Sequence, residues 1–197
     1  MTSFEAIPLP DAEISYLAQL PLADTPEAIM QGLITGTAWR AEKIVVWGKT
    51  YAQPRLTAWY GNEGIAYTYS GIRLEAQPWT ETLRDIKQRV EKLAGVTFNS
   101  VLLNYYRNER DSMGLHSDDE PELGRRPTIA SLSLGAERMF LLKHKSRKDL
   151  KPVRLKLASG SLLLMKGETQ HCWKHGIEKM TQPCLPRVNL TFRRVGG

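Results

Sequence analysis

The chain has 197 residues, of which 42% are hydrophobic and 24% charged, and its mean hydropathy is −0.36. A chain of this size buries enough surface to fold without disulfide bonds, and the composition excludes disordered and fibrous proteins. No apolar stretch reaches the roughly 18–20 residues of a membrane span, and the first residues lack the basic segment of a secretory signal. The two cysteines, Cys172 and Cys184, form no CxxC pair, which excludes a zinc knuckle and favours the reducing cytoplasm.

Charge is distributed unevenly along the chain. The net charge is +6, but residues 1–39 contain five acidic residues and no Lys or Arg, so the remainder carries +11. A basic excess of this size attracts polyanions such as nucleic acid, although many basic proteins are simply solvated. Charge alone leaves both interpretations open.

Two segments have the signals of helices. Residues 25–36 begin with Thr25-Pro26, an N-cap followed by a first-turn proline, and Gly36 can end the helix. A second helix is predicted to begin near Thr80 and to end at Gly95, with apolar residues spaced three and four apart. This apolar stripe predicts that the second helix covers one face of a sheet.

Most of the chain after this helix has strand-like patterns separated by turns, which indicates a β-sandwich or barrel. Residues 40–197 are predicted to form one unit, preceded by an N-terminal extension, residues 1–39, that carries the short helix. The predicted strands cover residues 97–106, 128–134, 137–144, 152–158, 160–165 and 186–194.

An imidazole and a carboxylate lie two residues apart at His116 and Asp118, and they point to the same side if the backbone is extended. Together with a second histidine they would form the 2-His-1-carboxylate set that binds Fe(II) and leaves three adjacent positions open. On this short motif alone, a solvated turn is the more common explanation.

The segment 186–194 has a polar face and an apolar face. Period-2 alternation separates its polar residues from Val188, Leu190 and Phe192. The polar face could lie in water, or it could line a pocket in which two guanidinium groups bind a dianion at both ends. The residues of this polar face are Arg187, Asn189, Thr191 and Arg193, and Asn104 and Tyr106 share a face of another strand that could bind the same anion.

Taken together, several separated motifs resemble the AlkB family of Fe(II)/2-oxoglutarate dioxygenases. The similarity runs through residues 44–194 in uninterrupted order and is greatest with the nucleic-acid repair branch. The motifs are VWGKTYAQPRLTAWYG, AYTYSG, LNYYRNERDSMGLHSDDEPELG, PTIASLSLGAERMF, GSLLLMKGETQHCWKHG and PRVNLTFRR.

The resemblance implies an iron site whose ligands, also the catalytic residues, are His116, Asp118 and His175. His171 lies four residues before His175 and could in principle supply the third ligand. In the family, however, the distal histidine follows an aromatic residue by two positions, as His175 follows Trp173. His144, in a basic stretch, is expected to be solvated.

The resemblance also implies how 2-oxoglutarate and a nucleobase would bind. The distal carboxylate would be held by Arg187, Tyr106 and Asn189, and the chelating end by Arg193 and Asn104, with Thr191 on the same face. Tyr69 and His116 would sandwich a flipped base, Asp119 and Glu120 would lie near its polar edge, and Tyr67, Thr68 and Ser70 alongside. Trp47 could be a wedge that enters the duplex or, equally, a core residue.

The expected fold is therefore mainly β, a double-stranded β-helix (jelly roll) with flanking helices, an N-terminal extension and a nucleotide-recognition lid over residues 44–75. The expected activity is oxidative demethylation of bases such as N1-methyladenine and N3-methylcytosine in DNA and RNA. It would consume 2-oxoglutarate and O2 at Fe(II) and release succinate, CO2 and formaldehyde. The alternatives are a dioxygenase acting on a regulatory RNA mark or on protein, and an inactive nucleic-acid-binding module. A monomer is expected, with no membrane partner.

Overall fold

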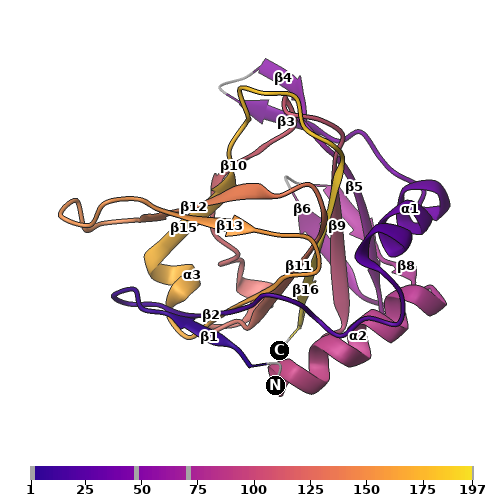
Figure 1. The fold of residues 1–197 in the computed structure, drawn as a ribbon, viewed down its shortest axis with the longest axis horizontal. Coiled ribbons are helices and arrows are strands. Elements are labelled where there is room, and N and C mark those ends of the chain that lie inside the picture. The colour runs from indigo at the N-terminus through magenta and orange to yellow at the C-terminus, as the bar shows by residue number, and fades with distance from the viewer. Residues whose placement is uncertain (1–2, 47–48, 70–71, 197) are drawn as a thin grey trace.

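The computed structural model describes residues 3–46, 49–69 and 72–196, and it describes side chains outside residues 44–49 and 66–75. Figure 1 shows two β-sheets that face each other, with the two longer helices on the outer side of one of them. The space between the sheets contains the polar side chains considered below.

The larger sheet has eight strands in the order β1-β2-β14-β11-β16-β9-β5-β8. All neighbours in it are antiparallel except β5 and β8. Its strands are β1 (Glu5–Ile7), β2 (Glu13–Leu17), β5 (Leu56–Gly61), β8 (Gln77–Pro78), β9 (Ser100–Tyr106), β11 (Ile129–Gly135), β14 (Leu162–Lys166) and β16 (Arg187–Arg193).

The smaller sheet has four strands in the order β10-β15-β12-β13. Its strands are β10 (Met113–His116), β12 (Arg138–His144), β13 (Val153–Leu157) and β15 (Trp173–Ile177). Two separate hairpins are formed by β3 (Lys43–Val46) with β4 (Lys49–Ala52) and by β6 (Ala66–Tyr69) with β7 (Ile72–Glu75).

From β9 onwards the chain passes back and forth between the two sheets. The strands β9, β11, β14 and β16 belong to the larger sheet, whereas β10, β12, β13 and β15 belong to the smaller one. This alternation is the winding of a double-stranded β-helix, so the predicted jelly roll is confirmed. Each strand predicted between residues 97 and 194 is present, with ends shifted by a few residues.

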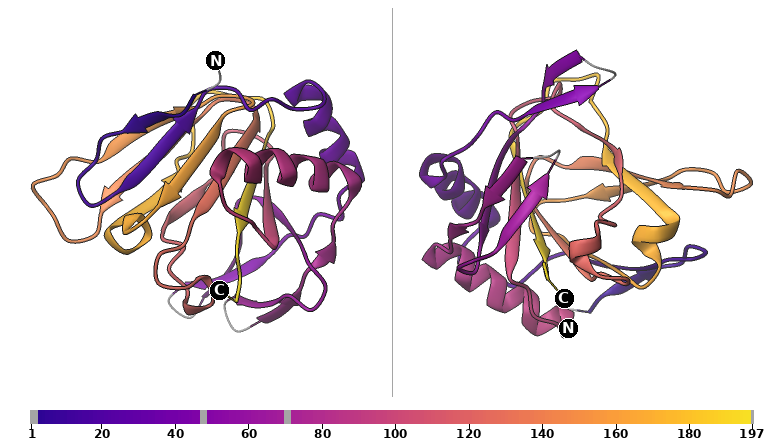
Figure 2. Two further views of the ribbon diagram at one scale, coloured as in Figure 1. Left: turned by 90° about the horizontal axis from the view of Figure 1, so that it is seen from below. Right: turned by 180° about the vertical axis from the view of Figure 1, so that it is seen from behind.

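Both predicted helices are present. In α1 (Pro26–Gly36) the Thr25 side chain accepts a hydrogen bond from the Ala28 backbone N–H, and in α2 (Glu81–Ala94) Thr80 caps Leu83 in the same way. Gly95 ends α2 with a φ of 71°, a left-handed conformation that favours glycine. Figure 2 shows both helices against the outer face of the larger sheet. No helix in the described residues is long and apolar enough to cross a membrane.

The hydrophobic core between these helices and the sheet confirms the apolar stripe predicted for α2. Its members are completely or almost completely buried. They include Leu83, Ile86 and Val90 from α2, Leu132 and Leu134 from β11, and Val188, Leu190 and Phe192 from β16.

The N-terminal segment differs from the prediction because it contains strands as well as a helix. β2 pairs with β14 along its whole length, so the larger sheet extends across the predicted boundary at residue 39. The alternation in Glu13–Leu17 is too short to be distinctive in the sequence, and it becomes a strand because β14 offers a partner edge. The division into two parts at residue 39 therefore does not coincide with a break in the sheet.

The predicted lid range, residues 44–75, contains two kinds of element. In the described residues the hairpins β3–β4 and β6–β7 pair only within themselves, whereas β5 between them is a strand of the larger sheet, paired with β9. The predicted wedge Trp47 and the predicted pocket residue Ser70 lie outside the described residues.

Candidate metal centre and adjoining cavities

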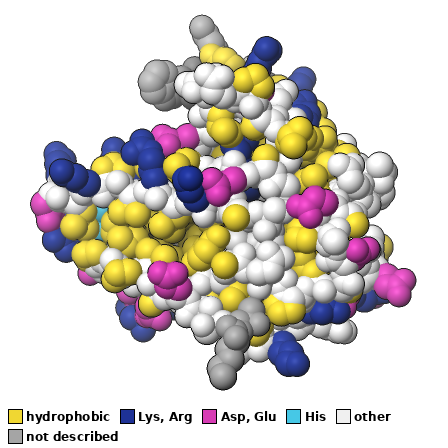
Figure 3. Space-filling model, viewed as in Figure 1, with side chains coloured by type: hydrophobic (Ala, Val, Ile, Leu, Met, Phe, Trp, Pro, Cys, Tyr) yellow, Lys and Arg dark blue, Asp and Glu magenta, His cyan; other side chains and the backbone are white. Residues whose placement is uncertain are grey.

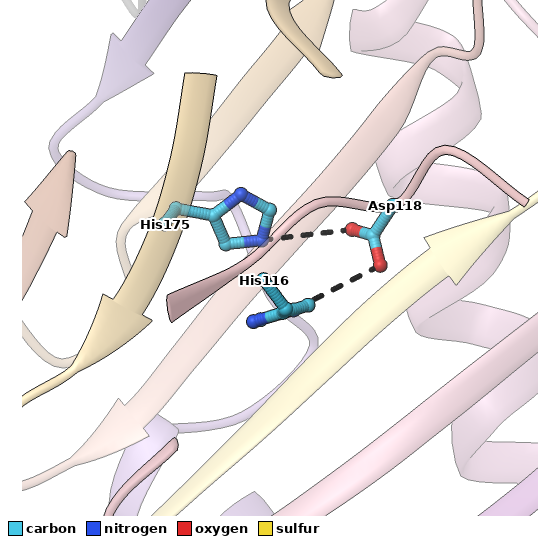
Figure 4. A group of neighbouring side chains, drawn as sticks. All are labelled: His116, Asp118 and His175. Atoms are coloured by element: carbon cyan, nitrogen blue, oxygen red, sulfur yellow. Dashed lines mark ion pairs between the residues drawn. The ribbon is translucent and has the colours of Figure 1, made fainter. Parts of the chain in front are cut away.

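Three side chains from distant parts of the sequence converge between the two sheets. His116 ends β10, Asp118 follows it by two residues, and His175 lies on β15 directly opposite His116. The Nε2 atoms of His116 and His175 lie 4.0 and 3.7 Å from the two oxygens of Asp118. Figure 4 shows the three side chains pointing toward one another, and their ligand atoms all lie within 4.8 Å.

A glycine allows the two histidine-bearing strands to approach closely. A Cβ atom at Gly176 would lie 2.7 Å from the carbonyl oxygen of Met113, closer than packing allows. Because Gly176 has no side chain, β10 can lie close against β15 beside His175.

The surroundings of both histidines suit metal binding. Nδ1 of His116 lies 3.0 Å from the carbonyl oxygen of Gly114, which can only accept, so Nδ1 is the donor and Nε2 is the nitrogen that lies near Asp118. Burial lowers the pKa of His175 to about 3, an effect that His116 strengthens and Asp118 opposes. His175 is therefore a neutral imidazole near neutral pH.

Asp118 is a buried carboxylate that remains ionised. Burial by itself raises its pKa, but its surroundings, chiefly the charge of Arg193, hold the pKa below its usual value. Nη2 of Arg193 donates to Oδ1 at 2.5 Å, whereas Oδ2 is buried and accepts no hydrogen bond from any described residue. A buried carboxylate oxygen without a hydrogen bond is costly, and a metal ion would satisfy it. The two imidazoles and this carboxylate fit the 2-His-1-carboxylate set expected for Fe(II).

The other two histidines do not belong to this group. His171 is exposed, and its Nε2 lies against the carbonyl oxygen of Arg125. The expectation that His144 is solvated was wrong: it is 8% exposed and its ring packs edge-on against Trp173, with centroids 5.0 Å apart. His144 lies at the end of β12, where Trp173 covers it, and neighbouring basic residues gave no sign of this burial.

The polar face of β16 is buried rather than solvated. Arg187, Asn189 and Thr191 are 1%, 6% and 8% exposed. Thr191 donates to the side-chain oxygen of Asn189, whose amide nitrogen donates to Ser131 on β11. The face therefore lines the interior between the sheets, as the second of the two interpretations of this strand expected.

Arg187 is the unusual member of this face. Its Nη2 donates to Ser133, but its Nε and Nη1 are buried and have no hydrogen-bond partner among the described residues. Its guanidinium lies 5.1 Å from the ring centre of Tyr106. Burial lowers its pKa to about 10 against the opposing effect of Tyr106, so it stays positively charged near neutral pH. An anion such as a carboxylate would supply an acceptor for this buried guanidinium.

These residues enclose a small cavity of about 30 Å³ between the sheets. Its lining combines the metal-site residues with the polar face of β16 and Tyr106. The lining residues are Tyr106, Met113, His116, Asp118, Ser131, Phe140, Met165, His175, Gly176, Ile177, Arg187, Asn189, Thr191 and Arg193.

A second, larger cavity of about 150 Å³ also borders the metal site. The two cavities share Met113, His116, Asp118 and Arg193. The metal site therefore lies at the boundary between a smaller and a larger cavity.

The larger cavity contains polar residues that the sequence did not identify. Gln53 and Arg55 are 5% and 6% exposed, and Arg40 also lines the cavity. The side-chain oxygens Oε1 of Gln53 and, beside it in the lining, Oε2 of the predicted residue Glu120 are buried and have no hydrogen-bond partner among the described residues. The alternation of Gln53, Arg55 and Thr57 within the VWGKTYAQPRLTAWYG motif was the signal that could have identified Gln53 and Arg55.

Several predicted site residues have other surroundings than expected. The side-chain oxygen of Asn104 accepts a hydrogen bond from Nε of Arg55 at 2.8 Å, and Asn104 borders neither cavity. Asp119 pairs with Lys145 at 2.7 Å and is absent from the cavity lining, whereas Glu120 belongs to it. Tyr67, Thr68 and Tyr69 lie on β6, and their side chains lie outside what the structure describes.

Comparison with known proteins agrees with this geometry. Residues 15–193 match the 2OG-Fe(II) oxygenase superfamily. The chain is 46% identical over 182 residues to "Alpha-ketoglutarate-dependent dioxygenase alkB homolog 3" of Homo sapiens, covering 87% of this chain and 63% of that protein. It is 43% identical over 159 residues to "DNA oxidative demethylase ALKBH2" of Mus musculus, covering 78% and 66%. The chain thus spans less than two thirds of the length of these relatives.

A solved structure, "The structure of OsALKBH1", has the same fold. It superimposes with a TM-score of 0.67 at 18% sequence identity, covering 98% of this chain and 100% of that one. The sequence match begins within β2, which agrees with the place of that strand in the sheet. On the matched motifs, the shared fold and the His-Asp-His group, the chain belongs to the 2OG-Fe(II) oxygenase superfamily and, within it, to the AlkB family.

Proposed function

We propose that the protein is an Fe(II)- and 2-oxoglutarate-dependent dioxygenase that removes N-alkyl groups from nucleic-acid bases. One atom of O2 enters succinate, and CO2 is lost from 2-oxoglutarate. The other atom is inserted into an N-methyl C–H bond. The resulting hydroxymethyl group then leaves as formaldehyde: its C–N bond breaks, the electron pair goes to the ring nitrogen, and the hydroxyl proton is released to solvent.

His116, Asp118 and His175 would hold the iron. When bound, Fe(II) supplies the chemistry by which O2 oxidises 2-oxoglutarate and then the N-alkyl group. The chain's own residues orient two of the three ligands: Gly114 orients His116 through a hydrogen bond, and Arg193 orients Asp118 through an ion pair.

Arg187 would hold the distal carboxylate of 2-oxoglutarate in the smaller cavity. Its two unsatisfied nitrogens support this assignment, because a buried guanidinium with donors that lack acceptors favours an anionic partner. Tyr106, Asn189 and Thr191 would shape the rest of this cavity. Arg193 would lie beside the end of 2-oxoglutarate that chelates the iron. Asn104, which was predicted to bind the same end, would act there indirectly through its hydrogen bond with Arg55.

The larger cavity, which Glu120 lines, would receive the alkylated base. N1-methyladenine and N3-methylcytosine are cations near neutral pH, and the unsatisfied oxygen of Glu120 would favour them over neutral bases. The hairpins within residues 44–75, including Trp47, Tyr67, Thr68, Tyr69 and Ser70, are proposed as the nucleotide-recognition lid, with Tyr69 and His116 on either side of the base. Asp119 would act at the edge of this pocket through Lys145.

The charge of the chain supports a nucleic-acid partner. Residues 40–197 carry +11, and Figure 3 shows Lys and Arg side chains gathered at the end of the molecule formed by the β12–β13 hairpin. Phosphate groups are the natural partners of such a surface. We propose further that the protein is a monomer and acts in the cytoplasm.

The observation that carries this proposal is the position of the His-Asp-His group at the boundary of two cavities. The smaller cavity is lined by Arg187, which has two unsatisfied nitrogens, and the larger cavity is lined by Gln53 and Glu120, which have unsatisfied oxygens. A dianionic co-substrate and a cationic base could thus each reach the same metal ion from a cavity of its own.

The test is repair of oligonucleotides that carry N1-methyladenine or N3-methylcytosine, followed by mass spectrometry, with DNA and RNA as single and double strands. We expect loss of the methyl group together with equimolar succinate, dependent on Fe(II) and 2-oxoglutarate. If succinate forms but no oligonucleotide loses its methyl group, the substrate class is wrong while the dioxygenase chemistry stands.

A further inference from the structure

The metal-site carboxylate lies on a segment that no strand supports. β10 ends at His116, and Asp118 follows in a stretch without regular structure before the next short helical turn at Pro121–Leu123. His175, in contrast, is held within β15 by pairing on both sides. Something other than the sheet must set the position of Asp118 relative to the two histidines.

Gln170 provides this contact. It lies on the short helix α3 (Thr169–Cys172), directly before β15, and is 1% exposed. Its Oε1 accepts a hydrogen bond from the backbone N–H of Asp118 at 3.0 Å, while its Nε2 points to the sulfur of Met165 at 3.5 Å. Because the backbone N–H of Asp118 can only donate, the side-chain oxygen of Gln170, and not its nitrogen, must face the Asp118 segment.

Lys145 forms a second link between Gln170 and the segment that contains Asp118. Its ammonium donates to the backbone oxygen of Gln170 at 2.8 Å and to Oδ2 of Asp119 at 2.7 Å. It thereby ties the residue after Asp118 to the residue that binds Asp118. A third bond, from Oγ of Ser117 to the backbone oxygen of Trp173 at 3.0 Å, completes the connection between the two segments.

We infer that Gln170 is a positioning residue for the metal site, which it reaches through the backbone of Asp118, and that Lys145 secures this contact. The inference rests on the proposed function, because it assumes that Asp118 binds a metal ion. Gln170 lies five residues before His175, so it joins the ligand pair His116 and Asp118 to the third ligand. Without it, the N–H of Asp118 would be buried with no acceptor, and its segment would shift away from the histidines.

A neighbouring residue offers a matched control. Thr169 is also 1% exposed and lies on the same helix, but its hydroxyl contacts the backbone of Glu13 and Lys166 instead of the metal-site segment. Thr169→Val and Gln170→Leu both replace a buried polar side chain on α3 with an apolar one of similar size. They differ in whether the lost contact leads to Asp118.

The experiment is titration of the metal-free full-length protein with Co(II), followed by visible absorption, in parallel with thermal unfolding. We expect Gln170→Leu to weaken Co(II) binding about 10- to 100-fold. Thr169→Val should bind Co(II) as the wild type does, within about twofold, although its melting temperature also falls. Gln170→Glu, which keeps an acceptor oxygen, should recover most of the lost affinity.

Three outcomes overturn the inference. The first is unchanged Co(II) affinity in Gln170→Leu, and the second is an equal loss in Thr169→Val, which would mean that any damage to α3 acts on the site. If Gln170→Leu does not fold, Lys145→Met replaces it as the test. A loss of Co(II) affinity of roughly threefold or more in Lys145→Met supports the inference. Wild-type Co(II) affinity in Lys145→Met is the third outcome that overturns it. Failure of the wild type to bind Co(II) at all would instead reject the proposed metal site.

Discussion

The two faces of β16 are buried to almost the same extent, yet one belongs to the hydrophobic core and the other lines a cavity. Val188, Leu190 and Phe192 are fully buried and pack under the helices. Arg187 on the opposite face is also only 1% exposed, but two of its nitrogens have no hydrogen-bond partner among the described residues. The comparison teaches that burial alone does not mark a hydrophobic core: where polar groups are buried and left unsatisfied, the structure is prepared for a ligand.

The largest effect is expected at the metal ligand that faces β16. His175→Ala leaves two of the three ligands, so metal binding and 2-oxoglutarate-dependent turnover should be lost. His171→Ala, at the exposed histidine four residues earlier, should keep most of the activity. Succinate formation and Co(II) titration measure both variants. Loss of activity in His171→Ala together with activity in His175→Ala would reverse the assignment.

The next effect separates ligand binding from stability on the polar face. Arg187→Met should raise the 2-oxoglutarate concentration needed for half-maximal turnover by the equivalent of about 2–5 kcal/mol. Without 2-oxoglutarate its melting temperature should be unchanged or higher, because a buried cation with unsatisfied nitrogens costs free energy. A wild-type response to 2-oxoglutarate would show that Arg187 does not bind the co-substrate.

The apolar face should respond in the opposite way. Val188→Ala removes two buried methyl groups and should lower the free energy of unfolding by about 2 kcal/mol. Half-saturation by 2-oxoglutarate should stay within twofold of the wild type below the unfolding transition. Chemical denaturation and co-substrate titration test the two statements. An increased 2-oxoglutarate requirement in this variant would mean that the two faces of β16 are not independent.

The smallest effect is expected in the larger cavity. Glu120→Gln removes a negative charge beside the proposed base, so it should reduce the preference for N1-methyladenine over neutral N3-methylthymine by about 1 kcal/mol, roughly fivefold. Glu122→Gln is the control, because Glu122 is exposed and does not line the cavity. Competition between two oligonucleotides gives this ratio directly. An unchanged ratio in Glu120→Gln would remove this carboxylate from base recognition.

Local pattern determined much of the fold. The caps at Thr25, Thr80 and Gly95 set the helix ends, because capping depends on residues adjacent in sequence. Period-2 alternation likewise assigned the side chains of β16 to their two faces. The spacing of His116 and Asp118, read with the family motifs, identified the ligand group that the structure brings together.

Other features were decided only when distant segments met. β10 and β15 were not predicted, because Met113–His116 and Trp173–Ile177 each contain a glycine and the second segment also has an exposed lysine. They become strands because they pair with each other and β15 pairs also with β12. Alternation showed that Arg187 and Val188 face opposite ways, but both faces proved to be covered, one by helices and one by the second sheet. The sequence alone could not determine this, since burial of a face depends on what packs against it. The same holds for Gln170 and Lys145, whose contacts with the Asp118 segment join residues 25 or more positions apart.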